Sequence, residues 1–192
     1  MIVGITGNYC SGKDSASRFF SQHGFTVIDV DKVGYEALEA KREEIVRTFG
    51  EDIVTGDRVD RKKLGRIVFS DSGMKKKLES IVHPWMIRKV KGALCRDGDT
   101  VINAALLVEM CLFVLCDFVL GIQVKEGRAI ERGMARDALS RKEVNERIRA
   151  QIPLKQKIQY VDKIIDNNGT IEEFEKRIID LIASLRRQKG AL

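Results

Sequence analysis

The 192-residue chain is poor in the residue types that several common kinds of site require. It has four cysteines and two histidines, and no two cysteines form a Cys-x-x-Cys pair. These counts argue against a zinc site, and the length of the chain argues against a disulfide framework. The aromatic content, 6%, argues against the stacking platforms of proteins that bind single-stranded nucleic acid. We therefore expect reduced thiols and no nucleic-acid partner.

The sequence also lacks an uninterrupted apolar run long enough to cross a bilayer. The longest run, Ala104 to Val124, contains Glu109 and Asp117, so it indicates a strand, a short helix and a second strand. The first residues, MIVGITG, have no basic residue before their apolar run, which is untypical of a signal peptide. These absences predict a cytoplasmic protein with no membrane partner.

Short apolar runs and helical spacing predict a parallel α/β domain. Ile2 to Thr6 reads as a buried strand, Lys13 to His23 as a helix, and Thr26 to Val30 as a second strand. This is a βαβ unit, which implies parallel strands joined by a right-handed crossover. Further elements follow, with strands at 101–108, 118–124 and 161–166 and an amphipathic closing helix at 170–187.

Two segments are too helical to be simple crossovers. Residues 32–96 are helical and highly charged, with turns near Gly50, Gly56 and Pro84, and they predict a helical insertion. His83, before Pro84, indicates a helix boundary. Residues 127–160 are helical and rich in arginine. The net charge of +6 is spread over these segments and the tail, so it suits a polyanionic small substrate better than a nucleic acid.

The strongest motif is Gly7-x4-Gly12-Lys13, placed after the first strand and before the first helix. Its glycines let backbone N–H groups turn toward phosphate oxygens, the helix N-terminus adds positive charge, and the lysine reaches the β and γ phosphates. A plain strand-to-helix turn is a poor alternative in this context. The motif predicts a P-loop kinase that binds ATP. The residues expected to contact the nucleotide are Asn8, Tyr9, Cys10, Ser11, Gly12, Lys13, Asp14 and Ser15.

Two loop positions depart from the usual motif. Asp14 stands where a Ser or Thr hydroxyl binds Mg²⁺. Either Asp14 holds the metal directly or through water, which we favour, or Ser15 compensates, or nucleotide binding is weakened. Cys10 could have a redox role at a helix N-terminus, but a small residue that simply fits is the favoured interpretation. In place of glycine it requires a negative φ.

Carboxylates and arginines complete the candidate site. Asp31 follows the second strand and could accept a proton from an attacking hydroxyl, cap a helix, or do both. Glu109, at the end of the third strand, could contact the acceptor, organise Mg²⁺-bound water, or be solvated. Arginines of a closing lid can neutralise charge in phosphoryl transfer, and a solvated basic face is the alternative. The lid role is favoured for Arg132 and Arg136 and the solvated one for Arg128 and Arg149.

Several motifs resemble those of dephospho-coenzyme A kinases along almost the whole chain. GITGNYCSGKD is similar to GLTGGIGSGKS, VIDVD to VIDAD, NAALLVE to PLLFE, and VDKIIDNNG to ADxVIxNxG. The stretch from DRVDRKKLGRIVFSD to LESIVHPWMIRKV resembles GxLDRxxLxxxVFxD…LExIxHPxI, a pattern that other small-molecule P-loop kinases lack. The segment RAIERGMARDALSRKEVNERIRAQ resembles the family's lid, with paired arginines and a later Arg and Gln.

The resemblance implies a fold of the P-loop nucleoside-triphosphate hydrolase type, with a five-stranded parallel sheet flanked by helices. The core would comprise 1–31, 97–126 and 161–192, the acceptor-binding insertion 32–96 and the lid 127–160. It implies transfer of the γ-phosphate of ATP, with Mg²⁺, to the 3′-hydroxyl of dephospho-CoA, giving CoA and ADP.

The resemblance also implies roles for single residues. Asp31 would be the general base, and Asn167 would lie near the adenine. The catalytic set would be Lys13, Asp31, Arg132 and Arg136. The substrate-binding set would be Asp31, Arg61, His83, Arg88, Glu109 and Arg147, with Arg147 also part of the lid.

Two further function classes stay open. One is another P-loop kinase that acts on a nucleoside monophosphate or a small metabolite, and the other is a catalytically weak nucleotide-binding regulator, suggested by Asp14. A nucleic-acid-binding module fits least. We expect a monomer or a weak homo-oligomer.

Overall fold

The computed structural model describes residues 1–94 and 98–190. The chain forms two compact units, one from the residues before Val30 and after Leu94, and the other from Val30–Leu94. Cys95 lies outside the described residues, while the other three cysteines are free thiols. Among the helices formed by the described residues, none is long and apolar enough to cross a membrane.

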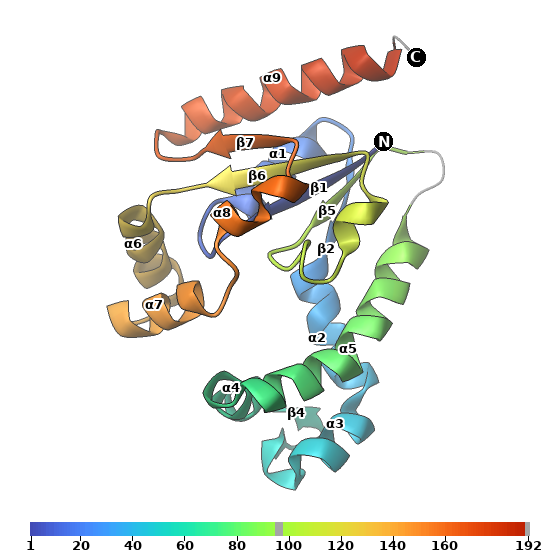
Figure 1. The fold of residues 1–192 in the computed structure, drawn as a ribbon, viewed down its shortest axis with the longest axis vertical. Helices are drawn as coiled ribbons and strands as arrows, with labels where there is room; N and C mark the ends of the chain where they lie inside the picture. The colour runs from blue at the N-terminus through green and yellow to red at the C-terminus, as the bar shows by residue number, and fades with distance from the viewer. Residues whose placement is uncertain (95–97, 191–192) are drawn as a thin grey trace. The chain divides into compact units, whose positions relative to one another are not determined.

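The first unit is built on a five-stranded parallel sheet with the order β2-β5-β1-β6-β7 (Figure 1). The strands are β1 (Ile2–Gly7), β2 (Thr26–Asp29), β5 (Thr100–Asn103), β6 (Phe118–Gln123) and β7 (Lys163–Asp166). The central strand β1 pairs with β5 up to Ile5↔Asn103 and with β6 up to Gly7↔Ile122. Since all strands run in parallel, their carboxyl ends meet at the edge where ligands bind in such sheets. The predicted fold class is confirmed.

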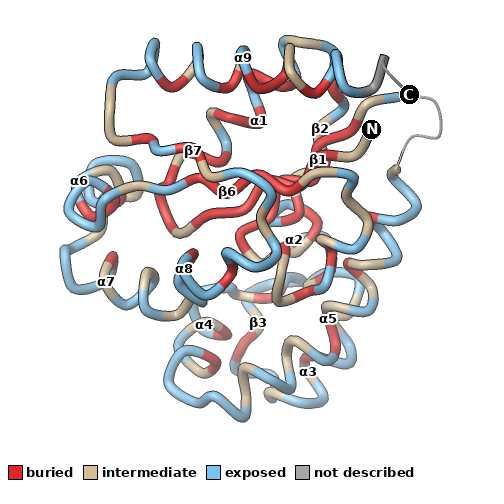
Figure 2. The backbone as a smooth tube through the Cα atoms, turned by 45° about the horizontal axis from the view of Figure 1, so that its top comes forward, coloured by how far each residue is buried: buried red, intermediate tan, exposed pale blue. Residues whose placement is uncertain are grey.

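The two faces of this sheet pack against different segments. Helices α1 (Lys13–Gln22) and α9 (Ile171–Gly190) cover one face, where Val3 and Ile5 join Phe20 and Phe174 in the main apolar core. Gly4 faces the other side, where an added Cβ would lie 2.8 Å from Leu107 Cδ2. This alternation is the period of two expected of a strand, and Figure 2 shows long buried stretches in the central strands β1 and β6.

The segment after β5 differs from the prediction. The strand predicted at 101–108 ends at Asn103, and the chain continues as a turn and a 3₁₀ helix, η2 (Leu112–Leu115), before β6. Its apolar residues Ala104, Ala105 and Leu107 are buried against the sheet instead of within it. A short apolar run has the same sequence pattern whether it forms a buried strand or a turn that packs on the sheet, so periodicity could not distinguish the two.

Between β6 and β7 the chain is helical, as predicted for 127–160. It forms α6 (Glu126–Asp137), α7 (Arg141–Arg149), α8 (Leu154–Lys157) and η3 (Ile158–Tyr160). Helix α7 begins with a capping box in which Ser140 and Glu143 each accept a hydrogen bond from the other's backbone N–H. Helix α6 ends at Asp137, and the next residue, Ala138, has a φ of 52°.

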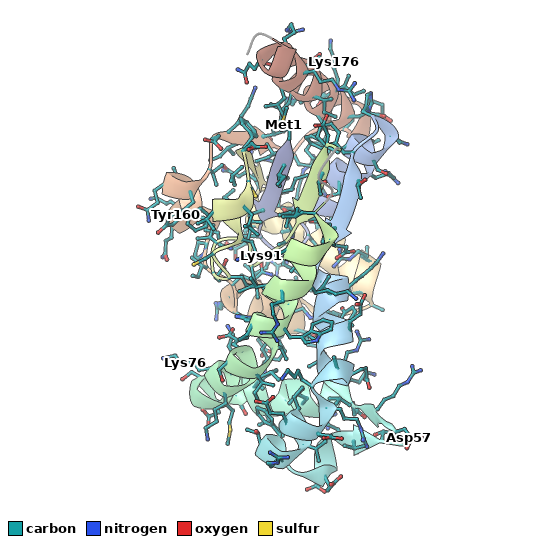
Figure 3. All side chains as sticks on the ribbon, turned by 90° about the vertical axis from the view of Figure 1, so that its right-hand side faces the viewer. Met1, Asp57, Lys76, Lys91, Tyr160 and Lys176 are labelled. Atoms are coloured by element: carbon teal, nitrogen blue, oxygen red, sulfur yellow. The ribbon has the colours of Figure 1, made fainter. Side chains whose placement is uncertain are left out.

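The Val30–Leu94 unit is mainly helical. It contains α2 (Val30–Ala40), α3 (Arg42–Phe49), η1 (Glu51–Ile53), β3 (Val54–Thr55), β4 (Arg58–Val59), α4 (Arg61–Ser70) and α5 (Ser72–Ala93). The β3–β4 hairpin was not predicted, although Gly56 and Asp57 form its two-residue turn, with a φ of 60° at Gly56 (Figure 3). The limits of this unit lie close to those of the predicted insertion.

The predicted turn at Pro84 and helix boundary at His83 are wrong, because α5 runs through both residues. Proline lacks the N–H that would bond to the carbonyl four residues earlier, which usually breaks a helix. Here Val82 and Met86, on either side of Pro84, are buried, and α5 packs along α2 and α4. Tertiary packing on both sides of the proline therefore holds the helix continuous.

Candidate active site

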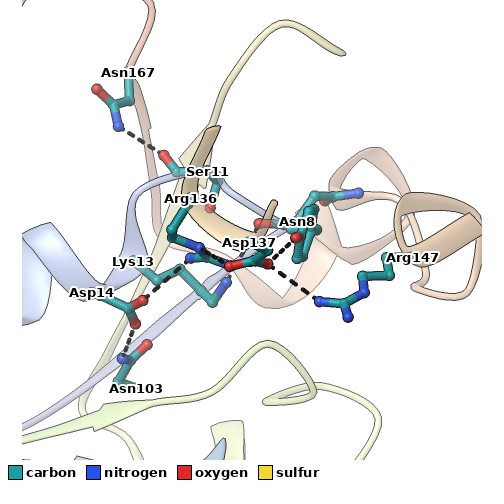
Figure 4. A network of polar contacts seen from close by, with 10 residues as sticks. Asn8, Ser11, Lys13, Asp14, Asn103, Arg136, Asp137, Arg147 and Asn167 are labelled. Atoms are coloured by element: carbon teal, nitrogen blue, oxygen red, sulfur yellow. Dashed lines mark hydrogen bonds and ion pairs between the residues drawn. The ribbon is translucent and has the colours of Figure 1, made fainter. Parts of the chain in front are cut away.

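The loop Asn8–Gly12 joins β1 to α1 at the carboxyl edge of the sheet (Figure 4). Gly12 has a φ of 102°, and an added Cβ would collide with Asn167 Nδ2. An added Cβ at Gly7 would lie 2.5 Å from the Ile122 carbonyl oxygen. Both motif glycines are therefore required by close packing as well as by backbone conformation.

Lys13 is the first residue of α1 and is 9% exposed. Its ammonium donates a hydrogen bond to the Asn8 carbonyl oxygen at 3.4 Å, so the side chain reaches back along the loop. This is where a phosphate loop requires its lysine.

The second half of the loop is held by the end of β7. Asn167, 5% exposed, donates from Nδ2 to the Ser11 carbonyl oxygen at 2.8 Å. Arg132, on α6, donates to the Asn167 carbonyl oxygen at 3.0 Å. Asn167 and Arg132, both predicted to contact the nucleotide, are therefore linked to the loop, Asn167 directly and Arg132 through Asn167.

The first half of the loop is held by the segment that follows α7. The Tyr9 N–H donates to Gln151 Oε1 at 2.8 Å, and Asn8 Oδ1 accepts from the Leu154 N–H at 3.0 Å. Gln151 was not among the predicted site residues, although it appeared in the motif that resembles the lid. Its role as a backbone partner could not be inferred from its residue type.

One carboxylate, Asp137 at the end of α6, contacts Arg136 and Arg147, two of the three arginines predicted for the lid. It accepts from Arg136 Nε at 2.8 Å and Nη2 at 3.1 Å, from Arg147 Nη1 at 3.2 Å, and from the Tyr9 hydroxyl. The two guanidinium carbons lie 5.3 and 5.7 Å from the centroid of the Tyr9 ring, within cation–π range. Asp137 was missed by the sequence analysis, and its position next to Arg136 was the only available signal.

The charges of this cluster reinforce one another. The Arg136 guanidinium holds the pKa of Asp137 down at about 2, and the same contact raises the pKa of Arg136. Burial, followed by the hydrogen bond to Asp137, raises the pKa of Tyr9. The cluster is therefore an ionised carboxylate between two cations near neutral pH.

Cys10 has a φ of 55°, so the expectation of a negative φ at this position is wrong. Such a φ is uncommon for a residue other than glycine. The side chain compensates by packing, because it is 9% exposed in a small cluster with Ala129, Ile130 and Val144. Burial raises the pKa of the Cys10 thiol, which disfavours the reactive thiolate and argues for the interpretation as a small residue that fits.

Asp14 lies in the first turn of α1, followed by the half-buried Ser15. Its Oδ1 accepts from Asn103 Nδ2 at 2.9 Å, and its Oδ2 lies 3.8 Å from Arg136 Nη1. Asn103 ends β5 and was missed because the strand was predicted to run to residue 108. Its Oδ1 is buried and without a hydrogen-bond partner among the described residues.

This corner fits a magnesium ion. It offers a carboxylate and an amide oxygen that has no hydrogen-bond partner among the described residues, and both are hard ligands. The described part of the chain has no cluster of three or more acidic, His or Cys side chains that could hold a metal ion. Mg²⁺ does not need one, because it is usually held by one or two carboxylates together with substrate phosphates.

Glu109 lies in the turn after β5 instead of at the end of a strand. Its Oε1 lies 2.8 Å from the ammonium of Lys157, a residue that is 1% exposed and also donates to the Ala105 carbonyl oxygen at 2.9 Å. The carboxylate is therefore held in a buried ion pair. Lys157 was missed, since nothing in its sequence context marks it as buried.

Four predicted substrate residues lie in the Val30–Leu94 unit. Strand β2 ends at Asp29 and α2 begins at Val30, so Asp31 lies in the first turn of α2, where it is exposed. A carboxylate at this place interacts favourably with the partial positive charge of the helix N-terminus. Arg61 begins α4, and its guanidinium carbon lies 4.1 Å from the Tyr35 ring centroid. On α5, His83 is half-buried and Arg88 is exposed. Their roles toward the acceptor stay predictions.

Comparisons with known proteins agree along the chain. The profile of the dephospho-CoA kinase family matches residues 1–173. A dephospho-CoA kinase of Geobacter sulfurreducens is 41% identical, in an alignment that covers 95% of this chain and 97% of the relative. Among solved structures, TT1252 from Thermus thermophilus has a TM-score of 0.83 and 34% identity, covering 96% of this chain and 97% of that chain. A dephospho-CoA kinase from Campylobacter jejuni has a TM-score of 0.73 and 25% identity, covering 100% and 98%. The chain belongs to the dephospho-CoA kinase family.

Proposed function

We propose that this chain transfers the γ-phosphate of ATP to the ribose 3′-hydroxyl of dephospho-CoA and releases CoA and ADP, the last step of coenzyme A biosynthesis. The family match over residues 1–173 carries the proposal, because it includes both the phosphate loop and the whole Val30–Leu94 unit. The reaction would take place in the cytoplasm, in a monomer or a weak homo-oligomer.

The phosphate loop would bind the nucleotide. The N-terminus of α1 presents partial positive charge to the phosphates, and Lys13 adds a full charge at the same place. In this structure the loop N–H groups of Tyr9 and Ser11 donate to Gln151 Oε1 and to the Asn8 carbonyl oxygen, so these two would have to exchange partners to bind a phosphate.

The lid arginines would neutralise charge that develops on the phosphoryl oxygens. Arg136 already lies beside the first turn of α1, with Nη1 3.8 Å from Asp14 Oδ2. Arg132 is fixed beside the loop through Asn167, which would lie toward the adenine. Arg147 shares Asp137 with Arg136, so both guanidinium groups have a protein carboxylate in the absence of phosphate.

Magnesium, when bound with ATP, would supply positive charge that offsets the negative charge of the phosphates. Asp14 would hold it, because its carboxylate is 74% exposed at the start of α1 and is a hard oxygen ligand. Ser15 is the alternative hydroxyl ligand at this end of the helix.

Asp31 would accept the proton of the acceptor hydroxyl. It follows β2 directly, and its carboxylate is exposed. Arg61, His83 and Arg88 would bind the acceptor's pyrophosphate and adenosine groups, since guanidinium groups suit phosphate oxygens. Glu109 would at most help to order the turn after β5, because its carboxylate is paired with Lys157.

A coupled assay of ADP release, with and without dephospho-CoA, tests the proposal. We expect ADP release that depends on dephospho-CoA in Mg²⁺ or Mn²⁺. Lys13→Ala should lower turnover by about 10²–10³-fold, as expected for the loss of a transition-state donor. Lys176→Ala, an exposed lysine on α9, is the matched control. Absence of acceptor-dependent turnover of the unaltered chain with both metals overturns the proposal.

Asp31→Asn tests the general base separately. The amide keeps the size of the side chain but cannot take the proton, so turnover should fall while ATP affinity stays near that of the unaltered chain. An equal loss of ATP affinity would instead give Asp31 a metal-binding or structural role.

A further inference from the structure

At positions 14 and 103 the charged and the neutral side chain stand on the opposite segments from those of P-loop NTPases. In P-loop NTPases the metal is held by the Ser or Thr hydroxyl that follows the loop lysine and by an aspartate of a second segment, the Walker-B segment. Here the helix position carries a carboxylate, Asp14, and the residue that contacts it from a second segment is a neutral amide, Asn103.

The sheet explains why these two residues meet although they are far apart in the sequence. Strand β5 is the neighbour of β1, with Asn103 in register with Ile5 at the carboxyl end of β5. Strand β1 continues to Gly7 and leads through the loop into α1. The first turn of α1 therefore lies over the end of β5, and Asn103 Nδ2 donates to Asp14 Oδ1 at 2.9 Å (Figure 4).

The amide of Asn103 is only half used by the protein. Its residue is 5% exposed, and its Oδ1 is buried without a hydrogen-bond partner among the described residues. A buried, unpaired carbonyl oxygen is costly, and such oxygens commonly mark the place of a ligand or water. An amide oxygen is also a ligand that hard divalent cations accept.

Glu109 does not compete for this role. It is the next carboxylate along the chain after β5, but its Oε1 lies 2.8 Å from the buried ammonium of Lys157. An aspartate at position 103 would also be unfavourable while position 14 is aspartate, because two carboxylates at hydrogen-bond distance repel each other. The amide removes that repulsion and replaces it with an N–H donor.

We propose that Asp14 and Asn103 form an exchanged metal-binding pair for the Mg²⁺ that accompanies ATP. Asp14 supplies the single carboxylate, and Asn103 orients it and offers the neutral oxygen. The pair keeps the same net charge as the usual hydroxyl and aspartate, but the carboxylate and the neutral side chain stand on the opposite segments, and the neutral one is an amide instead of a hydroxyl. The inference rests on the proposed function, since it takes ATP as the bound nucleotide.

The test is the affinity of Mn²⁺ for the complex of the full chain with ATP, measured by electron paramagnetic resonance of free Mn²⁺. Four chains are compared: the unaltered chain, Asp14→Ser, Asn103→Asp, and the double variant Asp14→Ser/Asn103→Asp. Asp180→Ser, which removes an exposed carboxylate of α9, controls for the change of net charge. Thermal unfolding without ligand checks that each variant folds, which the 74% exposure of Asp14 favours.

Asp14→Ser should weaken Mn²⁺ binding by about tenfold or more, because the pair then has no carboxylate. The double variant should recover affinity to within about threefold of the unaltered chain, because it has the usual hydroxyl and aspartate. Unchanged affinity in Asp14→Ser removes Asp14 from the site. A double variant no better than Asp14→Ser removes Asn103 from it. Either result overturns the proposal.

Failure of the proposed function has a different signature. An unaltered chain that binds Mn²⁺ and ATP but shows no ADP release with dephospho-CoA fails as a kinase of that acceptor. The metal titrations still report on the pair in that case, because they need no acceptor.

Discussion

The two halves of the phosphate loop are supported by different parts of the molecule. Asn8 and Tyr9 are held by the segment after α7, through the Leu154 N–H and the Gln151 side chain. Ser11 to Asp14 are held by residues that end strands of the sheet, Asn167 after β7 and Asn103 in β5. One loop therefore has a sheet-supported half and a lid-supported half.

The two kinds of support lead us to expect different mobility in the two halves of the loop. Residues at strand ends are fixed by the hydrogen bonds of five strands, whereas α6 to α8 are short helices joined by turns. We therefore expect the half that carries Lys13 to be the more rigid one, although Arg132 and Arg136 also contact it through Asn167 and Asp14. The half that is held by the segment after α7 should open more readily. The four predictions below begin with the largest expected effect.

Removing the support from the sheet should have the largest effect. Asn167→Ala leaves the Ser11 carbonyl oxygen without its side-chain donor, so the free energy of unfolding should fall by about 1–3 kcal/mol. Urea denaturation measures it, with ATP affinity as a second readout. Asn145→Ala, at a half-buried position on α7, is the control. A loss no larger than that of the lid-side variant Gln151→Ala would erase the distinction between the two halves.

Asp137→Asn weakens the carboxylate that gathers the lid arginines. At neutral pH it should lower the free energy of unfolding by about 1 kcal/mol, because Arg136 and Arg147 are 53% and 49% exposed and such pairs are screened by solvent.

The pH dependence has a definite sign. The pKa of Asp137 is lowered to about 2, against about 3.9 in an unfolded chain, so its ionised form stabilises the fold above that unfolded value. The difference between the unaltered chain and Asp137→Asn should therefore disappear as pH falls from about 4 through about 2. Denaturation curves across this range measure it, and a constant difference contradicts the assignment.

Removing the support from the lid should act mainly on local motion. Gln151→Ala frees the Tyr9 N–H, so hydrogen exchange at Tyr9 should accelerate while that at Ser11, which donates to the Asn8 carbonyl oxygen, changes little. The free energy of unfolding should fall by only about 0.5–1 kcal/mol. Gln156→Ala, an exposed glutamine on α8, is the control. Equal acceleration at both amides would show that the loop opens as one unit.

Substitutions of Cys10 should change the stability least, and they test the cost of the positive φ at this position. Cys10→Ala keeps the φ of 55° and loses the buried sulfur, whereas Cys10→Gly also removes the steric cost of that φ, about 1–2 kcal/mol. We expect Cys10→Gly to lie within about 1 kcal/mol of the unaltered chain, because lost burial offsets relieved strain. It should be more stable than Cys10→Ala. The reverse order in thermal denaturation would mean that the φ costs nothing.

The elements that the sequence predicted well carry a local signature. The phosphate loop has fixed spacing between Gly7, Gly12 and Lys13, and the strand before it and the strand after α1 are short apolar runs rich in β-branched residues. The position of Lys13 depends on the loop and on α1, not on residues distant in the sequence. The fold class and the family therefore followed from short stretches of sequence.

The partners at the site could not be predicted, because they depend on contacts across the fold. Asn103 is 89 positions from Asp14 and lies at a strand end that apolar periodicity placed five residues too late. Asp137 and Lys157 are ordinary charged residues in a sequence with 34 basic ones. The helix boundary predicted at Pro84 was wrong for a related reason, because packing of α5 against α2 and α4 outweighs the tendency of proline to end a helix.

The hydrogen bond between Asp14 and Asn103 also limits the order in which the two positions can change in evolution. Two single substitutions lead from this chain toward the common hydroxyl and aspartate pattern. Asp14→Ser first would leave a lineage with no carboxylate at this corner, whereas Asn103→Asp first would leave two that repel but still bind a cation. A lineage that moved between the two patterns one residue at a time would pass through the form with both carboxylates.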